Sequence, residues 1–143
     1  MKSCKPSVNL RLYTFTLAIE GMSRSYSPYS GCKVGAALLA RSGKVYLGCN
    51  VENAAYSPTI CAERVAFMKA VSEGEREFAA IAIVGGVNGE IKGLFPPCGV
   101  CRQVMAEFCN PDDFRILMVK GSDTYESVTL GDLLPYGFDK SKL

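Results

Sequence analysis

The stretch Phe78-Ala79-Ala80-Ile81-Ala82-Ile83-Val84 is an apolar run of alanine and β-branched residues that follows a phenylalanine. Such a run is typical of a central strand whose two faces are both covered. Residues 62–71 before it and residues 99–109 after it favour helix, and each of these segments begins next to a cysteine. A strand placed between two helices is the local pattern of an α/β fold.

Further strands are predicted on both sides of this unit. Val34 to Ala40 and Val45 to Cys49 are apolar segments separated by the turn Arg41-Ser42-Gly43-Lys44, which indicates an antiparallel hairpin. Ile116 to Val119 is predicted as a fourth strand, and Val128-Thr129 as part of a fifth, shorter one. The alternation of strands and helices predicts a three-layer α/β/α fold with a mixed sheet of about five strands.

The N-terminal part of the chain is predicted to form a packing helix. Ser7 is a candidate N-cap, and Gly21 weakens the far end. Four apolar residues have the spacing of one helical face: Leu12, Phe15, Ile19 and Met22. The length of 143 residues predicts a single domain over residues 1–143, with residues 1–6 frayed.

The composition excludes several functional classes. The chain has no histidine, which rules out Ser-His-Asp and Cys-His catalysis and any zinc site with an imidazole ligand. Its formal net charge of +2 gives no argument for nucleic acid, which usually needs a basic stripe. No apolar run follows residues 1–6 as in a signal peptide, and none is long enough to span a bilayer. We therefore expect a cytoplasmic protein, with the nucleus left open, that needs no membrane and no obligatory nucleic acid partner.

Two cysteine stretches contain the candidate catalytic residues: Cys61-Ala62-Glu63-Arg64 and Pro97-Cys98-Gly99-Val100-Cys101-Arg102. Both fall at predicted helix N-termini, where the helix dipole favours thiolates. The spacing of Cys98 and Cys101 lets two sulfur atoms reach one ion from a single turn, and Cys61 must come from the other helix. Three thiolates on zinc leave the fourth position for a water, so we expect one catalytic zinc per chain, with Glu63 handling the protons of that water.

Several residues in these stretches also allow a different interpretation. Cys98-x-x-Cys101 alone fits a redox pair or half of a structural zinc site. Glu63 alone fits a first-turn glutamate that favours the helix dipole. One or both of Arg64 and Arg102 are expected to offset the negative charge of three thiolates, and the alternative for each is a solvated arginine. The remaining cysteines are interpreted as small core residues or adventitious thiols: Cys4, Cys32, Cys49 and Cys109.

The two stretches match the zinc deaminase signature, H-x-E followed by P-C-x-x-C, with cysteine in place of histidine. From about Tyr26 to Phe138 the chain resembles the homotetrameric, three-cysteine type of cytidine deaminase. Five ordered blocks support the resemblance: Tyr26-Ser27-Pro28-Tyr29-Ser30, Val34-Gly35-Ala36-Ala37-Leu38-Leu39, Gly48-Cys49-Asn50-Val51-Glu52-Asn53-Ala54, Cys61-Ala62-Glu63-Arg64 and Pro97-Cys98-Gly99-Val100-Cys101-Arg102-Gln103. The resemblance implies zinc-dependent hydrolysis of cytidine or 2′-deoxycytidine to uridine or 2′-deoxyuridine and ammonia, in pyrimidine salvage.

The resemblance assigns residues to the base. Glu63 would protonate N3 and then carry the proton to the departing amine. The backbone N–H of Ala62 would contact the base carbonyl, and Arg64 would bond a zinc thiolate. The chain departs from the family at Cys32, where phenylalanine often packs against the base. It departs again at Pro96, where serine or threonine is common, although the backbone carbonyl that the family uses there is kept.

The resemblance also assigns residues to the sugar and to the neighbouring subunit. Asn50 and Glu52, which by themselves fit turn formers after a strand, would bind the ribose hydroxyl. Phe138 would reach the base held by an adjacent subunit, and Tyr56 would line a neighbouring site. The implied assembly is a homotetramer with shared active sites and a small-molecule nucleoside as substrate.

Three other functions stay open at this point. A deaminase of the same fold could act on a cytosine-containing antibiotic, although the Asn50-Val51-Glu52-Asn53 block favours an ordinary ribose. A polynucleotide deaminase would need a path for flanking nucleotides, which the short chain and its small charge argue against. A non-catalytic zinc module would need a closed site with four ligands.

Overall fold

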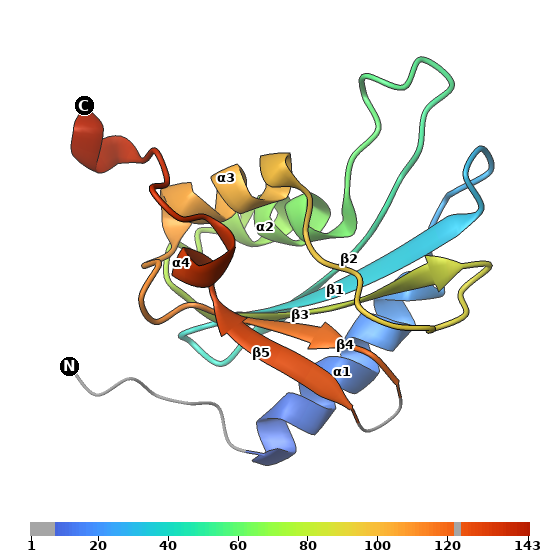
Figure 1. Ribbon diagram of the computed structural model, residues 1–143, viewed down its shortest axis with the longest axis horizontal. Helices are drawn as coiled ribbons and strands as arrows, with labels where there is room; N and C mark the ends of the chain where they lie inside the picture. The colour runs from blue at the N-terminus through green and yellow to red at the C-terminus, as the bar shows by residue number, and fades with distance from the viewer. Residues whose placement is uncertain (1–7, 122–123) are drawn as a thin grey trace.

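The computed structural model describes residues 8–121 and 124–143 and is built on one mixed sheet (Figure 1). The strands are β1 (Cys32–Ala40), β2 (Val45–Cys49), β3 (Phe78–Val87), β4 (Arg115–Val119) and β5 (Tyr125–Thr129), in the order β2-β1-β3-β4-β5. β3 and β4 are parallel, and the other neighbouring pairs are antiparallel. The mixed five-stranded sheet and the central position of β3 are confirmed. The expected fraying of residues 1–6 and the Ser7 cap lie outside the described residues.

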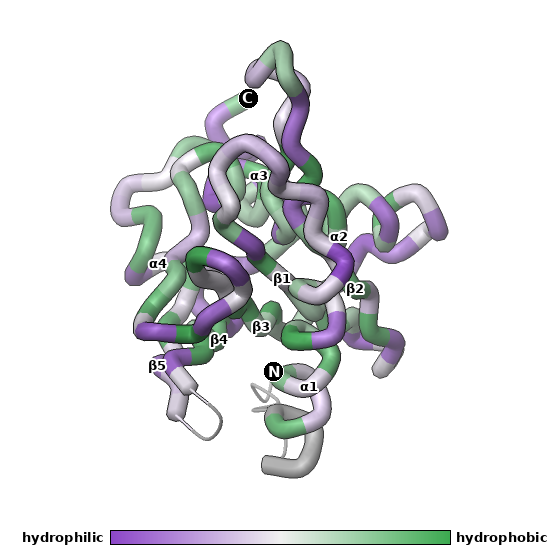
Figure 2. The backbone as a smooth tube through the Cα atoms, turned by 90° about the vertical axis from the view of Figure 1, so that its right-hand side faces the viewer, coloured by the Kyte–Doolittle hydropathy of each residue, from purple (hydrophilic) through white to green (hydrophobic). Residues whose placement is uncertain are grey.

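Helices cover both faces of the sheet, which confirms the three layers. α1 (Val8–Met22) lies on one face, and α2 (Ala62–Ser72) and α3 (Gly99–Phe108) lie on the other (Figure 1). The short α4 (Leu130–Leu133) and a 3-10 turn at Lys140–Lys142 follow β5. The tube in Figure 2 is hydrophobic along much of β1 and β3, as expected for strands buried on both faces. Over the described part of the chain, no helix combines the length and the apolar character needed to cross a membrane.

The apolar face predicted for α1 is only partly correct. Phe15 and Met22 are buried as expected, but Leu12 is 49% exposed and Ile19 is 37% exposed. The helix instead packs through Ala18, because its backbone lies directly on Gly35 of β1. A Cβ atom built on Gly35 would lie 2.0 Å from the Ala18 carbonyl oxygen. The spacing of hydrophobic residues does not predict a close backbone contact of this kind, because the residues that allow it are small.

β3 and β5 extend furthest beyond the predicted segments, while β1 begins at Cys32 and β4 at Arg115, slightly before their predicted starts. β3 continues past Val84 to Val87, because these last residues pair with the start of β1 from Cys32 to Val34. β5 covers five residues instead of two, and all five pair with β4. β5 is an edge strand with half-buried and exposed residues, so it lacks the apolar run that marks the central strands.

The sheet topology gathers several loops at one end. Because β1 is antiparallel to both β2 and β3, the start of β1 lies beside the ends of β2 and β3. The segments that meet there are the turn before Cys32, the loop after Cys49 and the connection from Val87 to α3. The N-termini of α2 and α3 point to the same side (Figure 1). This end of the sheet therefore brings both cysteine stretches together.

Candidate metal centre and active site

The three predicted zinc ligands form one cluster. Cys61 is the N-cap residue of α2, Cys98 is the N-cap residue of α3, and Cys101 lies in the first turn of α3. The Sγ atoms of Cys61 and Cys98 are 3.6 Å apart, those of Cys98 and Cys101 are 3.3 Å apart, and all three lie within 4.8 Å of one another. The two helices thus present three sulfur atoms from their N-terminal ends.

The cluster fits a zinc ion. Zinc–sulfur bonds of about 2.3 Å at tetrahedral angles place sulfur atoms roughly 3.8 Å apart. The separations of 3.6 and 3.3 Å are close to that value and the third pair lies within 4.8 Å, so the three sulfur atoms are placed to surround one ion. Neither N-cap cysteine uses its side chain to cap its helix. Their sulfur atoms are therefore free to act as ligands, in a field that favours thiolates.

The electrostatics of the cluster favour a thiolate at Cys61 and raise the pKa of the Glu63 carboxyl group. The Cys101 thiol and the Arg64 guanidinium, which both hydrogen-bond to Cys61, lower the pKa of Cys61 despite its partial burial. Glu63 is only 3% exposed, and this burial raises its pKa to about 7, with the charge of Cys61 adding to the effect. The side chain of Glu63 also reaches Cys101. A carboxyl group with a pKa near neutrality can both accept and donate a proton at physiological pH.

The two arginines have different surroundings. Arg64 Nη2 donates to Cys61 Sγ at 3.4 Å, as expected of a group that offsets thiolate charge. Its buried Nε has no hydrogen-bond partner among the residues that the structure describes. Of the two arginines it is therefore Arg64 that meets the expectation, and Arg102 has backbone partners. Its Nε donates to the Pro97 carbonyl at 2.8 Å and its Nη1 to the Leu133 carbonyl at 2.7 Å, so it braces the segment before Cys98 against the end of α4.

Asn50 lies at the sheet end described above and is 9% exposed. Its Oδ1 accepts hydrogen bonds from the Val34 backbone N–H at 2.9 Å and from the Ser25 hydroxyl. Its Nδ2 donates to the Cys32 carbonyl at 2.8 Å. A primary amide has two N–H donors, so one donor remains after these bonds. Asn50 therefore joins the start of β1 to the end of β2 and keeps one polar hydrogen for another partner.

Glu52 lies two residues further along and is held by Tyr29 and Ser30, which belong to a block that the sequence analysis identified without giving it a role. The backbone N–H groups of Tyr29 and Ser30 and the Ser30 hydroxyl all donate to its carboxylate. These bonds, the hydroxyl first, keep the pKa of Glu52 below its usual value. A cavity of about 370 Å³ opens beside the carboxylate, between Tyr29, Tyr56 and Thr59.

The remaining predicted site residues differ in exposure. Ala62 is the first residue of α2 and is fully buried, and the N–H groups of a first helical turn have no partner within the helix. Tyr56 is 74% exposed, with its ring edge-on to Tyr29 at 6.4 Å between centroids. Phe138 is 59% exposed, and its carbonyl accepts from Gln103 on α3. The C-terminal segment (red in Figure 1) leaves the body of the protein near the C-terminal end of α3, whereas the cysteine cluster lies at the N-terminal end of that helix.

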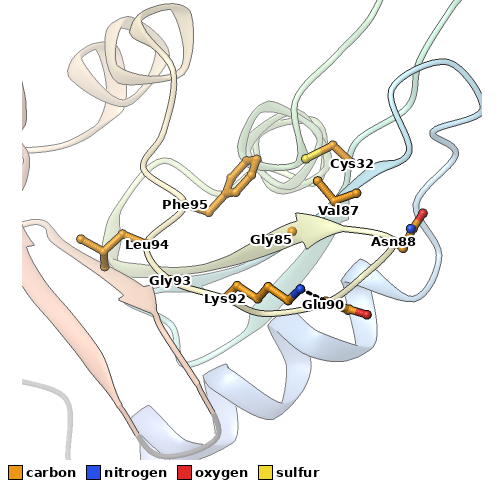
Figure 3. A pocket seen from close by; sticks show the side chains of 10 residues that line it. Cys32, Gly85, Val87, Asn88, Glu90, Lys92, Gly93, Leu94 and Phe95 are labelled. Atoms are coloured by element: carbon orange, nitrogen blue, oxygen red, sulfur yellow. Dashed lines mark ion pairs between the residues drawn. The ribbon is translucent and has the colours of Figure 1, made fainter.

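A second cavity, of about 580 Å³, extends from Cys32 along the connection between β3 and α3. Figure 3 shows the ring of Phe95 pointing towards Cys32 above Gly85. A Cβ atom on Gly85 would lie 2.8 Å from the Phe95 ring, so this glycine provides the space for it. Phe95 comes three residues before Cys98 and was not predicted from the sequence, because an isolated phenylalanine in a proline-rich loop carries no recognisable pattern.

Comparison with known proteins identifies relatives for most of the chain. Residues 9–117 match the family model described as the cytidine and deoxycytidylate deaminase zinc-binding region. The cytidine deaminase of Sporosarcina psychrophila is 49% identical over 87% of this chain and 88% of its own. The probable cytidine deaminase of Dictyostelium discoideum is 44% identical over 83% of this chain and 77% of its own.

Solved structures agree in fold. The crystal structure of cytidine deaminase from Burkholderia pseudomallei superposes with a TM-score of 0.81 at 44% identity, covering 88% of this chain and 97% of that one. The crystal structure of cytidine deaminase from Mycobacterium tuberculosis superposes with a TM-score of 0.75 at 36% identity, covering 92% of this chain and 98% of that one.

Proposed function

Because the chain belongs to the cytidine and deoxycytidylate deaminase family, we propose that it deaminates cytidine and 2′-deoxycytidine by hydrolysis. In this reaction a water oxygen replaces the 4-amino group, and the products are the uridine nucleoside and ammonia. The observation that supports the proposal most strongly is the cluster of three Sγ atoms beside a buried carboxyl group. A catalytic zinc site needs three protein ligands with a proton carrier next to them.

The side chains at the site have different roles in the proposed reaction. Cys61, Cys98 and Cys101 would hold one zinc ion, which supplies Lewis acidity that activates water at neutral pH. Glu63 would take a proton from the attacking water, protonate N3 of the base, and deliver a proton to the leaving amine. Its pKa of about 7 suits this task, because the best acid–base catalysts titrate near the working pH. Arg64 would reduce the excess negative charge at the thiolates.

Asn50 and Glu52 are proposed to bind the sugar. After its internal hydrogen bonds Asn50 keeps one N–H donor, and Glu52 is an acceptor. A hydroxyl group donates one hydrogen and accepts others, so it can satisfy both side chains at once. We expect free cytosine to be a poor substrate, since binding of the sugar is used to position the base.

We further propose that the protein is a homotetramer with shared active sites. The position of the C-terminal segment away from the metal cluster and the exposure of Phe138 support a role for this ring in a neighbouring subunit. Tyr56, also exposed, is proposed to line a neighbouring site. Mixed oligomers of Glu63→Gln and Phe138→Ala chains test this: if each single variant is inactive, roughly a quarter of the sites should recover on random mixing. Verified mixed oligomers that stay inactive would exclude the shared site.

The function itself is tested by measuring ultraviolet absorbance during incubation with cytidine. Conversion to uridine, together with little conversion of free cytosine, would support it. Faster conversion of a cytosine-containing antibiotic or of single-stranded RNA or DNA would favour another deaminase. Zinc binding without turnover of any of these would favour a zinc-binding module. We also propose that residues 1–143 form a single domain, since all described strands share one sheet. We propose a cytoplasmic location and a role in pyrimidine salvage as well.

A further inference from the structure

The turn before β1 holds the Glu52 carboxylate with three hydrogen bonds. The backbone N–H groups of Tyr29 and Ser30 donate to Oε1 at 3.0 and 3.1 Å, and the Ser30 hydroxyl donates to Oε2 at 2.5 Å. The same hydroxyl oxygen accepts from the Cys32 backbone N–H at 3.0 Å. One serine side chain therefore connects the carboxylate to the first residue of the strand.

We propose that Ser30 is a positioning residue that orients the Glu52 carboxylate and leaves it one free acceptor position for the substrate. The inference rests on the proposed function, because it requires Glu52 to bind the sugar. An ionised carboxylate has about four lone-pair positions, and the turn occupies three of them. Glu52 can therefore accept one further hydrogen bond, from a single sugar hydroxyl.

The geometry of the turn supports a dedicated role. Gly31 has a φ of +69°, a left-handed conformation that glycine adopts without strain. Its N–H donates to the Ser27 carbonyl at 3.0 Å, and its carbonyl accepts from Asn88 at 2.8 Å, so the turn is fixed by its own backbone bonds. Loss of the Ser30 hydroxyl removes the bond from the Cys32 N–H but leaves the two backbone bonds of Gly31 in place, so the turn should keep its conformation. A Ser30 variant should then change activity through the position of the Glu52 carboxylate.

The chain contains a matched control for Ser30. In the hairpin between β1 and β2, the Ser42 hydroxyl donates to Glu75 at 2.8 Å and accepts from the Lys44 backbone N–H at 3.4 Å. This is the same arrangement of serine, glutamate and following N–H, at the opposite end of the same strand. Ser42→Ala removes an equivalent pair of hydrogen bonds far from Glu52.

Steady-state kinetics with 2′-deoxycytidine test the proposal. Ser30→Ala should raise KM about three- to tenfold, the effect expected for one hydrogen bond, and leave kcat within about twofold. Ser30→Thr, which keeps a hydroxyl, should restore KM, and Ser42→Ala should not change it. In a Glu52→Ala background, Ser30→Ala should cause no further loss in kcat/KM, because its effect acts through the carboxylate.

Two results would overturn the proposal. One is an unchanged KM in Ser30→Ala. The other is an equal loss in the parent and Glu52→Ala backgrounds, which would show that Ser30 acts on the turn and not through Glu52. A parent protein that does not convert 2′-deoxycytidine or cytidine would overturn the proposed function as well, and the parent measurement alone reveals that case.

Discussion

Substitution of Gly48 by alanine should displace the metal centre, although Gly48 is not part of it. Gly48 lies on β2 beneath the first turn of α2. A Cβ atom there would lie 2.1 Å from the Ala62 carbonyl oxygen and 2.8 Å from the Ala66 nitrogen. Both are backbone atoms, so no side-chain rotation relieves the clash. Ordinary contact begins at 3.4 Å, so the start of α2 must move by roughly 1.3 Å.

This displacement exceeds what a zinc site tolerates. Metal–ligand distances vary by only about 0.2 Å between good sites, and Cys61 directly precedes Ala62. We expect Gly48→Ala to weaken zinc binding at least tenfold and to lower the free energy of unfolding by about 1–3 kcal/mol. Competition with a chromogenic chelator measures the affinity, and urea denaturation measures the stability.

Gly35→Ala is the control for this prediction. Its Cβ would lie 2.0 Å from the Ala18 carbonyl on α1, so it forces a similar movement on the other face of the sheet. It should cost comparable stability and leave zinc affinity within about threefold of the parent. Unchanged zinc affinity in Gly48→Ala, or equal losses in both variants, would refute the argument that the displacement of α2 is responsible.

Three further predictions concern individual side chains. Each chain should bind about one zinc ion, and the double variant Cys98→Ala and Cys101→Ala should lose it, as measured by metal analysis. Glu63→Gln should keep zinc and fold but lose about 10²–10⁴-fold in kcat; a loss within tenfold would exclude Glu63 as the proton carrier. Gly85→Ala should lower the free energy of unfolding by about 1–3 kcal/mol in the parent and much less in a Phe95→Ala background, since the clash is with the Phe95 ring; equal losses would contradict this.

The sequence predicted the sheet and the clustering of the three cysteines because both have local patterns. The run from Phe78 to Val84 identified the central strand, and the ligand spacing of Cys98 and Cys101 identified the metal site. Helix N-termini at Cys61 and Cys98 follow from the segments that favour helix directly after them. Such features depend on neighbouring residues and need no knowledge of the tertiary structure.

Features that depend on tertiary contact were not predictable in this way. The face of α1 is set by the contact of Ala18 with Gly35, two small residues with no hydrophobic signal. The sequence could not tell which of Arg64 and Arg102 reaches the thiolates, and Arg102 instead reaches two backbone carbonyls, one of them on Leu133. The hydroxyl of Ser30 meets Glu52 from 22 residues away, and nothing in either local sequence indicates that contact.

The three proposed zinc ligands and the residues proposed to bind the sugar lie on different kinds of backbone. The cysteines lie directly before or in the first turn of helices that pack on the sheet, whereas Asn50 and Glu52 lie on the irregular connection after β2. Connections of this kind tolerate insertions and substitutions far better than packed elements do. The fold therefore separates the reaction from the choice of substrate. Lengthening or exchanging the segment at 50–60 is therefore a route to a new substrate range that leaves the reactive centre unchanged.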